Sequence, residues 1–481
     1  MDWQPAERGF DEALTADGVP RPHYASVVQR LEQLGREELA RREEMQRLSL
    51  VNQGITFTVY GEEDGIERIF PFDLVPRILD AREWSKIEAG ISQRITVLNL
   101  LLEDIYGAQK TLEAGLVPYQ LVMSMKEYLR SVVGIRPRHG TYTHVVGSDL
   151  LRDSDGSFLV LEDNCRCPSG VSYVLENRNL TARVFPELMI DRAIRGVENY
   201  PGMLLDCLRH AAPHGRQDPV VAVLTPGIFN SAYYEHSFLA NEMGAPLVEG
   251  RDLVVEDDQV FMRTTEGRQR VDVIYRRIDD EYIDPVTFDH DSMLGVPGLM
   301  HAYRTGNVAL ANAPGAGIAD NKAVYPCIPD LIRFFLDADP LIEQVRTWRG
   351  WIADDAKYIR ENMPDMVVKL AGGAGGYGML VGPTASKAEI AEFRACFDAD
   401  PSQYIAQHLV EFSSHPTHFG DTFEPRRVDL RVFALVGERT HVLPGGLTRV
   451  ALEKGSYVVN SSQGGGSKDT WVLHDVEGER S

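Results

Sequence analysis

The spacing of hydrophobic residues along the chain predicts helices and strands in alternation. Residues 24–47 carry apolar residues amid many Glu and Arg, which predicts an amphipathic helix with a solvated face. Residues 54–60 alternate β-branched with aromatic side chains, a pattern typical of a strand. Residues 74–106 show helical spacing again, and we expect a helix there. Its apolar face consists of Ile95, Leu98, Leu101, Leu102 and Ile105.

The region 201–310 has the pattern of an α/β unit. Residues 220–224 form a short apolar run closed by Thr-Pro-Gly, as buried parallel strands often do, and residues 271–275 repeat the pattern. Residues 1–20, by contrast, are polar with little periodicity. We expect them to form an arm.

Length, charge and cysteine count narrow the class of protein. A chain of 481 residues is too long for one compact core, so two or three domains are expected. Its 43% hydrophobic and 25% charged residues are the balance of a soluble globular protein. The net charge of −22 repels phosphate backbones and argues against a nucleic-acid partner. Five cysteines indicate a reducing compartment. Without a signal-peptide pattern or an apolar run of about 20 residues, we expect a cytoplasmic protein and no membrane segment.

A glutamate and an asparagine lie two positions apart in a predicted strand. Glu162 and Asn164 share one strand face, about 6–7 Å apart, so their oxygens can bracket a hard cation. Arg166 continues that face and can meet a phosphate or a carboxylate. Asp149 comes earlier, across a predicted turn at residues 153–156, and a hairpin would bring it to the same face as a third ligand. A surface Glu–Asn pair without a ligand is the alternative.

Later in the chain, a lysine precedes a glycine-rich segment. Lys369 lies among Val and Leu residues, where a buried ammonium group is costly unless it meets an anion such as an ATP phosphate. Gly373, Gly375 and Gly378 match GxGxxG, but no helix opens at them, as a dinucleotide-binding turn requires. We expect a strand–loop–strand flap over phosphates, with the next helix starting near Ser386. A glycine hairpin beside a lysine that reaches solvent is the alternative.

Residues 403–411 predict a further strand, whose backbone groups can meet the edge of an adenine base. Gln407 and Leu409 are the candidates there for nucleotide binding. A plain core strand is the alternative.

Together these stretches resemble the ATP-grasp superfamily, whose members share a lysine strand with a glycine flap, an adenine hinge and a Glu-x-Asn magnesium strand. The Glu-x-Asn strand usually comes last. Here it comes first, as in the circularly permuted ATP-grasp family related to glutathionylspermidine synthetases. The similarity covers roughly residues 50–475. Its motifs are LEDNCRCPSG from Leu161, VIYRRIDD from Val273, GIADNKAVY from Gly317, LPGGLTR from Leu443 and NSSQGGGSKD from Asn460.

The resemblance implies an α+β, circularly permuted ATP-grasp fold, with a mixed α/β domain and an N-terminal helical region. It also assigns roles to residues. ATP would contact Lys322, Lys369, Gly372, Gly373, Gly375, Gly376, Gly378, Gln407 and Leu409. Magnesium would be held by Asp149, Glu162 and Asn164. The catalytic candidates are Arg431, Arg449 and Arg166, and ordinary surface ion pairs are the alternative for Arg431 and Arg449.

The same resemblance divides the chain into four segments. Residues 1–117 form a mainly helical region, and residues 118–200 carry the metal strand. Residues 201–310 form an α/β domain of the kind that precedes an ATP-grasp unit. Residues 311–481 hold the lysine, the glycine flap and the central sheet.

The implied activity is that of an ATP- and Mg²⁺-dependent ligase that joins a carboxylate to an amine through an acyl phosphate. Its partners would be small-molecule or peptide substrates, and no residues match a grip on glutathione or a polyamine. A kinase on the same scaffold and an inactive nucleotide-binding protein are the alternatives. Because one ATP must touch both elements, we expect Glu162 and Lys369 within about 12 Å across one cleft. We also expect the Glu162 strand to pair with strands from residues 425–475.

Overall fold

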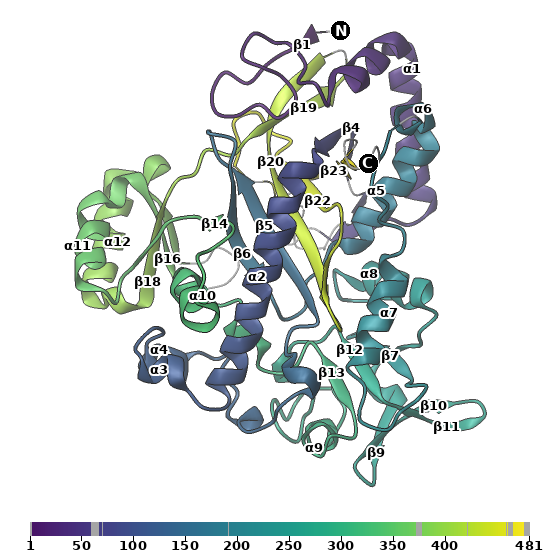
Figure 1. Ribbon diagram of the computed structural model, residues 1–481, viewed down its shortest axis with the longest axis vertical. Coiled ribbons are helices and arrows are strands. Elements are labelled where there is room, and N and C mark those ends of the chain that lie inside the picture. Colours follow the sequence, from purple (N-terminus) through teal and green to yellow (C-terminus); the bar gives the residue numbers. More distant parts are fainter. Residues whose placement is uncertain are drawn as a thin grey trace.

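A computed structural model of the chain describes residues 2–58, 67–69, 71–190, 192–371, 378–420, 422–457, 459 and 465–475. Within these ranges a ten-stranded sheet forms the centre of the molecule (Figure 1). Its strands run in the order β14 (Glu343–Gln344), β6 (Phe158–Asn164), β5 (Val145–Arg152), β20 (Thr422–Val436), β22 (Leu447–Val450), β23 (Gly466–Val472) and β4 (Phe72–Leu79). Three further strands pair with β20, namely β1 (Asp2–Trp3), β19 (Ser414–Phe419) and β21 (Thr440–Val442).

Two smaller sheets adjoin this central one. A parallel sheet has the order β13 (Ala309–Ala311), β12 (Val273–Arg276), β7 (Val221–Leu224) and β8 (Leu247–Val248), which confirms the parallel strands expected in the α/β region. An antiparallel sheet has the order β15 (Thr347–Arg349), β18 (Tyr404–His408), β16 (Met366–Leu370) and β17 (Met379–Val381). The described strands also form two antiparallel ribbons. They are β9 (Leu253–Glu256), β10 (Gln259–Thr264) and β11 (Gly267–Val271), and β2 (Thr56–Thr58) with β3 (Glu67–Ile69).

Helices cover the sheets. The long ones are α1 (Ala25–Asn52), α2 (Ala81–Ile105), α5 (Val171–Val184), α7 (Tyr200–His210), α8 (Tyr233–Met243), α10 (Ile328–Leu336), α11 (Ala353–Asn362) and α12 (Lys387–Ala399). The short ones are α3 (Lys110–Glu113), α4 (Tyr119–Ser124), α6 (Pro186–Met189) and α9 (Leu299–Arg304). None of the helices in the described ranges combines the length and the hydropathy needed to cross a bilayer.

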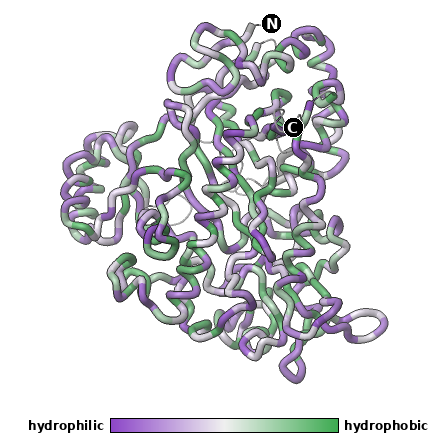
Figure 2. Tube along the Cα trace, viewed as in Figure 1, coloured by the Kyte–Doolittle hydropathy of each residue, from purple (hydrophilic) through white to green (hydrophobic). Residues whose placement is uncertain are grey.

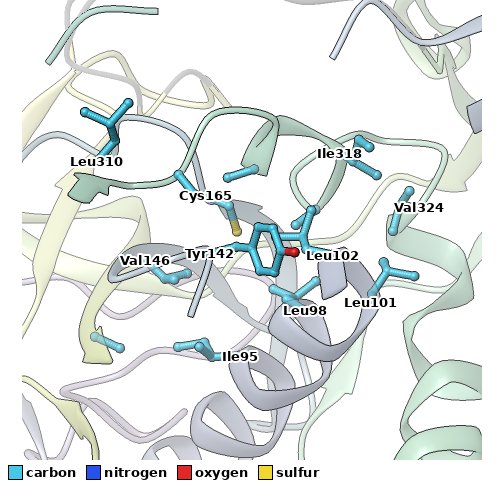
Figure 3. Packing of buried hydrophobic residues seen from close by; sticks show 14 of the residues in the cluster. Ile95, Leu98, Leu101, Leu102, Tyr142, Val146, Cys165, Leu310, Ile318 and Val324 are labelled. Atoms are coloured by element: carbon cyan, nitrogen blue, oxygen red, sulfur yellow. The ribbon is translucent and has the colours of Figure 1, made fainter. Parts of the chain in front are cut away.

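The main core lies where α2 packs on the central sheet. The helical face predicted from the sequence is buried, with Ile95, Leu98 and Leu101 fully covered. Figure 3 shows these side chains beside Tyr142, Val146 and other residues of the same cluster. Figure 2 shows the same division along the chain, with hydrophobic colouring on the central strands and mostly hydrophilic colouring on α1 and on the outer ribbon β9–β11.

The sheet β15–β18, with α11 and α12, has a core of its own. Its buried residues form a cluster separate from the main core, which includes Val368, Phe397 and Ala406. Figure 1 shows this group of elements projecting from one side of the molecule. We call residues 347–408 the lysine unit, because Lys369 lies on its strand β16.

Three expectations about elements need correction. Residues 74–79 are strand rather than helix, because they are buried on both faces beside β23, and the helix α2 begins only after Asp80 caps it. The pairing register shifts between Asp73 and Arg77, an interval that contains Pro76, which cannot donate to the ladder.

The N-terminal stretch is docked rather than a free arm. Strand β1 pairs with β20, and the buried carboxylate of Glu12 forms an ion pair with Arg77.

The third correction concerns sheet pairing. The Glu162 strand β6 pairs with β5 and β14, and not with strands from residues 425–475. The other strand of this hairpin, β5, pairs with β20. The hairpin places β5 on one edge of β6, and β14 pairs at the other edge, so β20 lies one strand away from β6, beside β5. The four-segment division of the chain stays a prediction.

Candidate functional site

A cleft of about 200 Å³ lies between β6, the loop 319–325 and the strands β16 and β18. Residues predicted to bind a metal ion, to bind the nucleotide and to take part in catalysis meet in it. From the predicted set, the cleft is lined by Glu162, Asn164, Arg166, Lys322, Lys369 and Gln407. The expected shared cleft between Glu162 and Lys369 is therefore confirmed.

The predicted hairpin supplies the acidic side of the cleft. Strands β5 and β6 are antiparallel, and Asp149 lies opposite Glu162 in the register. The Glu162 side chain is 46% exposed and faces the cleft. Asn164 donates from Nδ2 to the carbonyl oxygen of Gly147 at 3.2 Å. The hairpin thus holds both residues at the mouth of the site.

Asp149 is buried and bound to two arginines. Arg431, opposite it on β20, donates from Nε and Nη2 to its two oxygens at 2.6 and 2.8 Å. Arg449 of β22 donates from Nη2 to Oδ2 at 2.7 Å. Burial alone would raise the pKa of Asp149, but these guanidinium groups outweigh it and hold the pKa well below its usual range. A direct metal-ligand role for Asp149 stays a prediction.

A second buried acid, Asp429, joins Asp149 and its two arginines. No motif or spacing in the sequence pointed to it. It lies opposite Arg449 in the sheet and accepts from its Nε at 2.9 Å. We call Asp149, Asp429, Arg431 and Arg449 the ion cluster. Its two acids and two arginines carry formal charges that cancel, and all four lie on the central sheet.

Glu162 lies at the edge of the ion cluster. Its carboxylate is 4.0 Å from Nη2 of Arg431. The pKa of Glu162 is raised, first because the site is partly withdrawn from water and then because the negative charge of Asp149 is close. A cation at this position would favour the ionised form of Glu162.

The opposite side of the cleft is basic. Lys369 of β16 donates from Nζ to Oε1 of Gln407 on β18 at 3.1 Å, and Gln407 donates on to Oγ1 of Thr347 at 2.9 Å. The pKa of Lys369 is lowered by burial, opposed by the charge of Glu162 and reinforced by that of Lys322. An anion between the two lysines would relieve both the burial and the repulsion.

The glycine segment is only partly within the described ranges. Strands β16 and β17, the two strands expected on either side of the glycine segment, pair antiparallel, and Ser386 caps the following helix α12. Gly378 has a φ of 69°, a conformation that suits glycine in a tight turn. Gly372, Gly373, Gly375 and Gly376 lie outside the described residues. Leu409 lies just beyond the end of β18 and is not among the residues lining the cleft, so its adenine role stays a prediction.

Asp320 and Tyr325 line the cleft but were not predicted individually. Asp320 accepts from the backbone N–H groups of Cys165 and Arg166 and from the side chain of Arg166 at 3.1–3.2 Å. Burial raises its pKa to about 6, although Arg166 opposes the shift. Tyr325 donates to the carbonyl oxygen of Val160 at 2.6 Å. Both belong to the GIADNKAVY motif, in which only the lysine carried a recognisable chemical signal.

The donor set suits a cation that keeps ligands from its substrate. No group of three or more His, Cys, Asp or Glu side chains within the described ranges could enclose a metal ion. Among the carboxylates that line the cleft, Asp163 is paired with Arg94 and Asp320 with Arg166. The carboxylate of Glu162 and the amide oxygen of Asn164, two positions further along β6, are the groups best placed to meet a cation. Mg²⁺ bound to a nucleotide needs few protein ligands, because phosphates and water complete its octahedron. The residues therefore fit Mg²⁺ brought in with a nucleotide better than an isolated metal site.

Residues 76–451 match the family described as circularly permuted ATP-grasp type 2. The chain belongs to that family. A *Synechocystis* protein, named only as uncharacterized, is 51% identical over 96% of this chain and 97% of its own length. An uncharacterized *Mycobacterium tuberculosis* protein is 50% identical over 96% of this chain and 84% of its own.

Two further matches of this ATP-grasp chain carry names that state a chemistry. A *Frankia alni* protein, provisionally named glutamate–cysteine ligase 2-3, is 41% identical over 98% of this chain but only 54% of its own length. Its name therefore describes a protein about half of which this chain does not match. A solved structure, a glutathione synthetase-like effector from *Globodera pallida*, superposes with a TM-score of 0.61 over 91% of this chain and 98% of its own, at 11% identity. That likeness confirms the fold.

Proposed function

We propose that the protein is an ATP- and Mg²⁺-dependent ligase that joins a carboxylate to an amine through an acyl phosphate. The observation that carries the proposal is the cleft itself. Glu162 and Asn164 from the central sheet meet Lys322 and Lys369 around one space, although a long stretch of chain separates the two pairs. Family membership and the ligase name of the *Frankia alni* relative support it.

Each side of the cleft has a distinct task in this proposal. Lys369 and Lys322 bind phosphate oxygens of ATP, and Gln407 holds the Lys369 ammonium group in place. The glycine segment between β16 and β17, most of which lies outside the described residues, would cover the phosphates with its backbone amides. Leu409, beyond the end of β18, borders the adenine.

Glu162 and Asn164 hold the Mg²⁺ that ATP brings. When bound, this ion neutralises charge on the phosphate oxygens. Asp149 acts mainly through Arg431 and Arg449, since these two side chains already occupy both of its oxygens. Arg431 lies next to Glu162 and stabilises negative charge on the phosphoryl group in transfer.

The reaction has two displacement steps. A carboxylate oxygen of the first substrate attacks the γ-phosphorus of ATP, and ADP leaves with the electrons of the broken P–O bond. The neutral amine of the second substrate then attacks the acyl carbon. Phosphate leaves with the C–O bonding electrons, and the nitrogen loses a proton. Arg166, 37% exposed at the rim, orients the carboxylate for the first step.

The direct test is substrate-dependent ADP release. The protein is incubated with ATP, MgCl₂ and pooled carboxylic acids and amines, and ADP and phosphate are measured with mass spectrometry of the products. We expect release of ADP and phosphate in equal amounts only when an acid and an amine are both present. A phosphate ester without free phosphate would replace the ligase by a kinase. Nucleotide binding without turnover in any pool would leave a binding protein.

A further inference from the structure

The small parallel sheet has a topological switch point between β7 and β12. Strand β7 comes first in the sequence, β8 lies on one side of it, and β12 lies on the other. In open parallel α/β sheets a ligand usually binds outside the carboxyl ends of the strands at such a point. Here Arg277 follows the carboxyl end of β12, and Thr225 follows that of β7.

The chain's own segment 165–170 occupies this position. Arg277 donates from Nη1 to the carbonyl oxygen of Pro168 at 2.8 Å and from Nη2 to Oγ of Ser169 at 2.6 Å. The thiol of Cys167 lies 3.8 Å from the carbonyl oxygens of Arg276 and Ile278. The loop that connects β6 of the central sheet to α5 thus lies where a ligand of the small sheet would lie.

Glu235, at the start of α8, holds the end of that segment. Its Oε2 accepts from N–H of Gly170 at 2.7 Å, from N–H of Ser172 at 3.1 Å and from Oγ of Ser172 at 3.0 Å. Gly170 is the N-cap of α5 and has no side chain to cap it, so Glu235 supplies the cap from another helix. Its Oε1 accepts from Nη2 of Arg277 at 3.1 Å.

The Glu235–Arg277 ion pair is buried, and each side chain is 1% exposed. Burying two charges is costly unless their other hydrogen-bonding groups also find partners. Here most of the hydrogen bonds that Glu235 and Arg277 make, apart from the one between them, go to the segment 168–172. A buried ion pair is by itself weak evidence for stability. The pair does not line the cleft, so it acts on the site through the segment that it holds.

The held segment leads directly into the cleft. Asn164 is the last residue of β6, and the segment begins at the next position. On its other side, Ser169 accepts at its carbonyl oxygen from Nη1 of Arg431 at 3.2 Å. The segment therefore contacts Arg431 and continues the strand that carries Glu162 and Asn164.

We infer that Glu235 and Arg277 are positioning residues, which fix the end of the metal strand and Arg431 from the switch point of the α/β unit. The inference rests on the proposed function of the cleft. In this arrangement the switch point binds the chain itself and supports the neighbouring site. Outer groups that orient metal ligands typically change metal affinity by 10–100-fold when removed.

The test compares Glu235→Gln with Glu242→Gln, an exposed glutamate at the other end of the same helix. Mn²⁺ affinity in the presence of ATP is measured by electron paramagnetic resonance, and ADP affinity without metal by calorimetry. For Glu235→Gln we expect Mn²⁺ affinity to fall about tenfold, while metal-free ADP affinity, which depends on Lys322 and Lys369, stays the same. Hydrogen exchange should also become faster in residues 165–172. Glu242→Gln should change none of these.

A smaller change serves as a second test in case Glu235→Gln fails to fold. Ser169→Ala removes only the hydroxyl that accepts from Arg277. It should lower Mn²⁺ affinity by a few-fold and leave the melting temperature nearly unchanged.

Two results separate this inference from the proposed function. A lower melting temperature for Glu235→Gln with unchanged Mn²⁺ affinity and unchanged exchange would overturn the positioning role and leave the ligase proposal intact. Wild-type protein without metal-dependent nucleotide binding would instead overturn the proposed function. In that case the rate of hydrogen exchange in residues 165–172 would be the one measurement that shows whether the ion pair holds this segment.

Discussion

The two sides of the cleft carry charge in opposite ways. On the central sheet, Arg431 and Arg449 are matched by Asp149 and Asp429, so the charges are compensated within the fold. In the lysine unit, Lys369 is held by the neutral amide of Gln407. The first arrangement is complete without a ligand, and the second gains most of its compensation when an anion arrives. Mutations should therefore affect stability on the sheet side and nucleotide binding on the lysine side.

The strongest challenge to this comparison is Arg449→Met. It leaves Asp429 without its arginine and Asp149 with only one, in a buried setting. We expect the free energy of unfolding to fall by about 3–5 kcal/mol, the usual cost of breaking a buried pair from one side. Urea denaturation gives the value. Arg439→Met, at an exposed position next to the same strands, is the control. A loss in the free energy of unfolding below about 1 kcal/mol would mean that the ion cluster does little to stabilise the fold.

Glu162→Gln should separate function from stability on the sheet side. The residue is half-exposed and outside the ion cluster, so the melting temperature without nucleotide should barely move. Turnover should fall by about 100-fold or more, the scale of a lost group that stabilises transition-state charge. Steady-state ADP release at saturating MgCl₂ measures it. The matched control is Glu343→Gln on the neighbouring strand β14, which is exposed. Full activity of Glu162→Gln would remove this residue from the metal site.

Lys369→Ala should weaken nucleotide binding and leave stability nearly unchanged, which is the reverse of the effect expected for Arg449→Met. ATP affinity should weaken by about 1.5–3 kcal/mol, the range for a hydrogen bond to a charged group. The free energy of unfolding should change little, because the partner of Lys369 among the described residues is the neutral amide of Gln407. Calorimetry with ATP and Mg²⁺ measures the first quantity. Lys357→Ala, exposed on α11 of the same unit, serves for comparison. Unchanged nucleotide affinity would contradict the phosphate role of Lys369.

The smallest effect concerns pH. His144, just before β5, is buried, and burial together with the nearby His210 and His139 lowers its pKa to about 4. The folded pKa lies below the unfolded value of about 6.5, so the unfolded chain binds more protons between these values. Stability is therefore lost as pH falls through 6.5 and levels off near 4. Between pH 7 and 5 His144 should account for about 2 kcal/mol of that loss.

His144→Asn removes the titrating ring and should reduce the loss on acidification by that amount in urea denaturation at the two pH values. An identical pH dependence in the variant would show that His144 does not titrate between folded and unfolded states.

The sequence by itself determined the local elements of the site. The two-residue spacing of Glu162 and Asn164 and the turn at 153–156 predicted the hairpin that places Asp149 opposite Glu162. Hydrophobic flanks predicted the buried strand of Lys369. These features depend on neighbouring residues, so short patterns reveal them. The order of the motifs also indicated the permuted ATP-grasp family, which the family match confirmed.

Only the tertiary structure decided how distant segments share charge. Asp429 pairs with Arg449 across two strands, Asp320 binds the backbone after β6, and Glu235 caps a helix from another one. Such partners are set by sheet register and helix packing, which no local pattern encodes. For the same reason residues 74–79 form a strand although their spacing predicts a helix, since burial on both faces overrides that spacing. Local chemistry follows from adjacent residues, whereas electrostatic compensation follows from which surfaces the fold brings together.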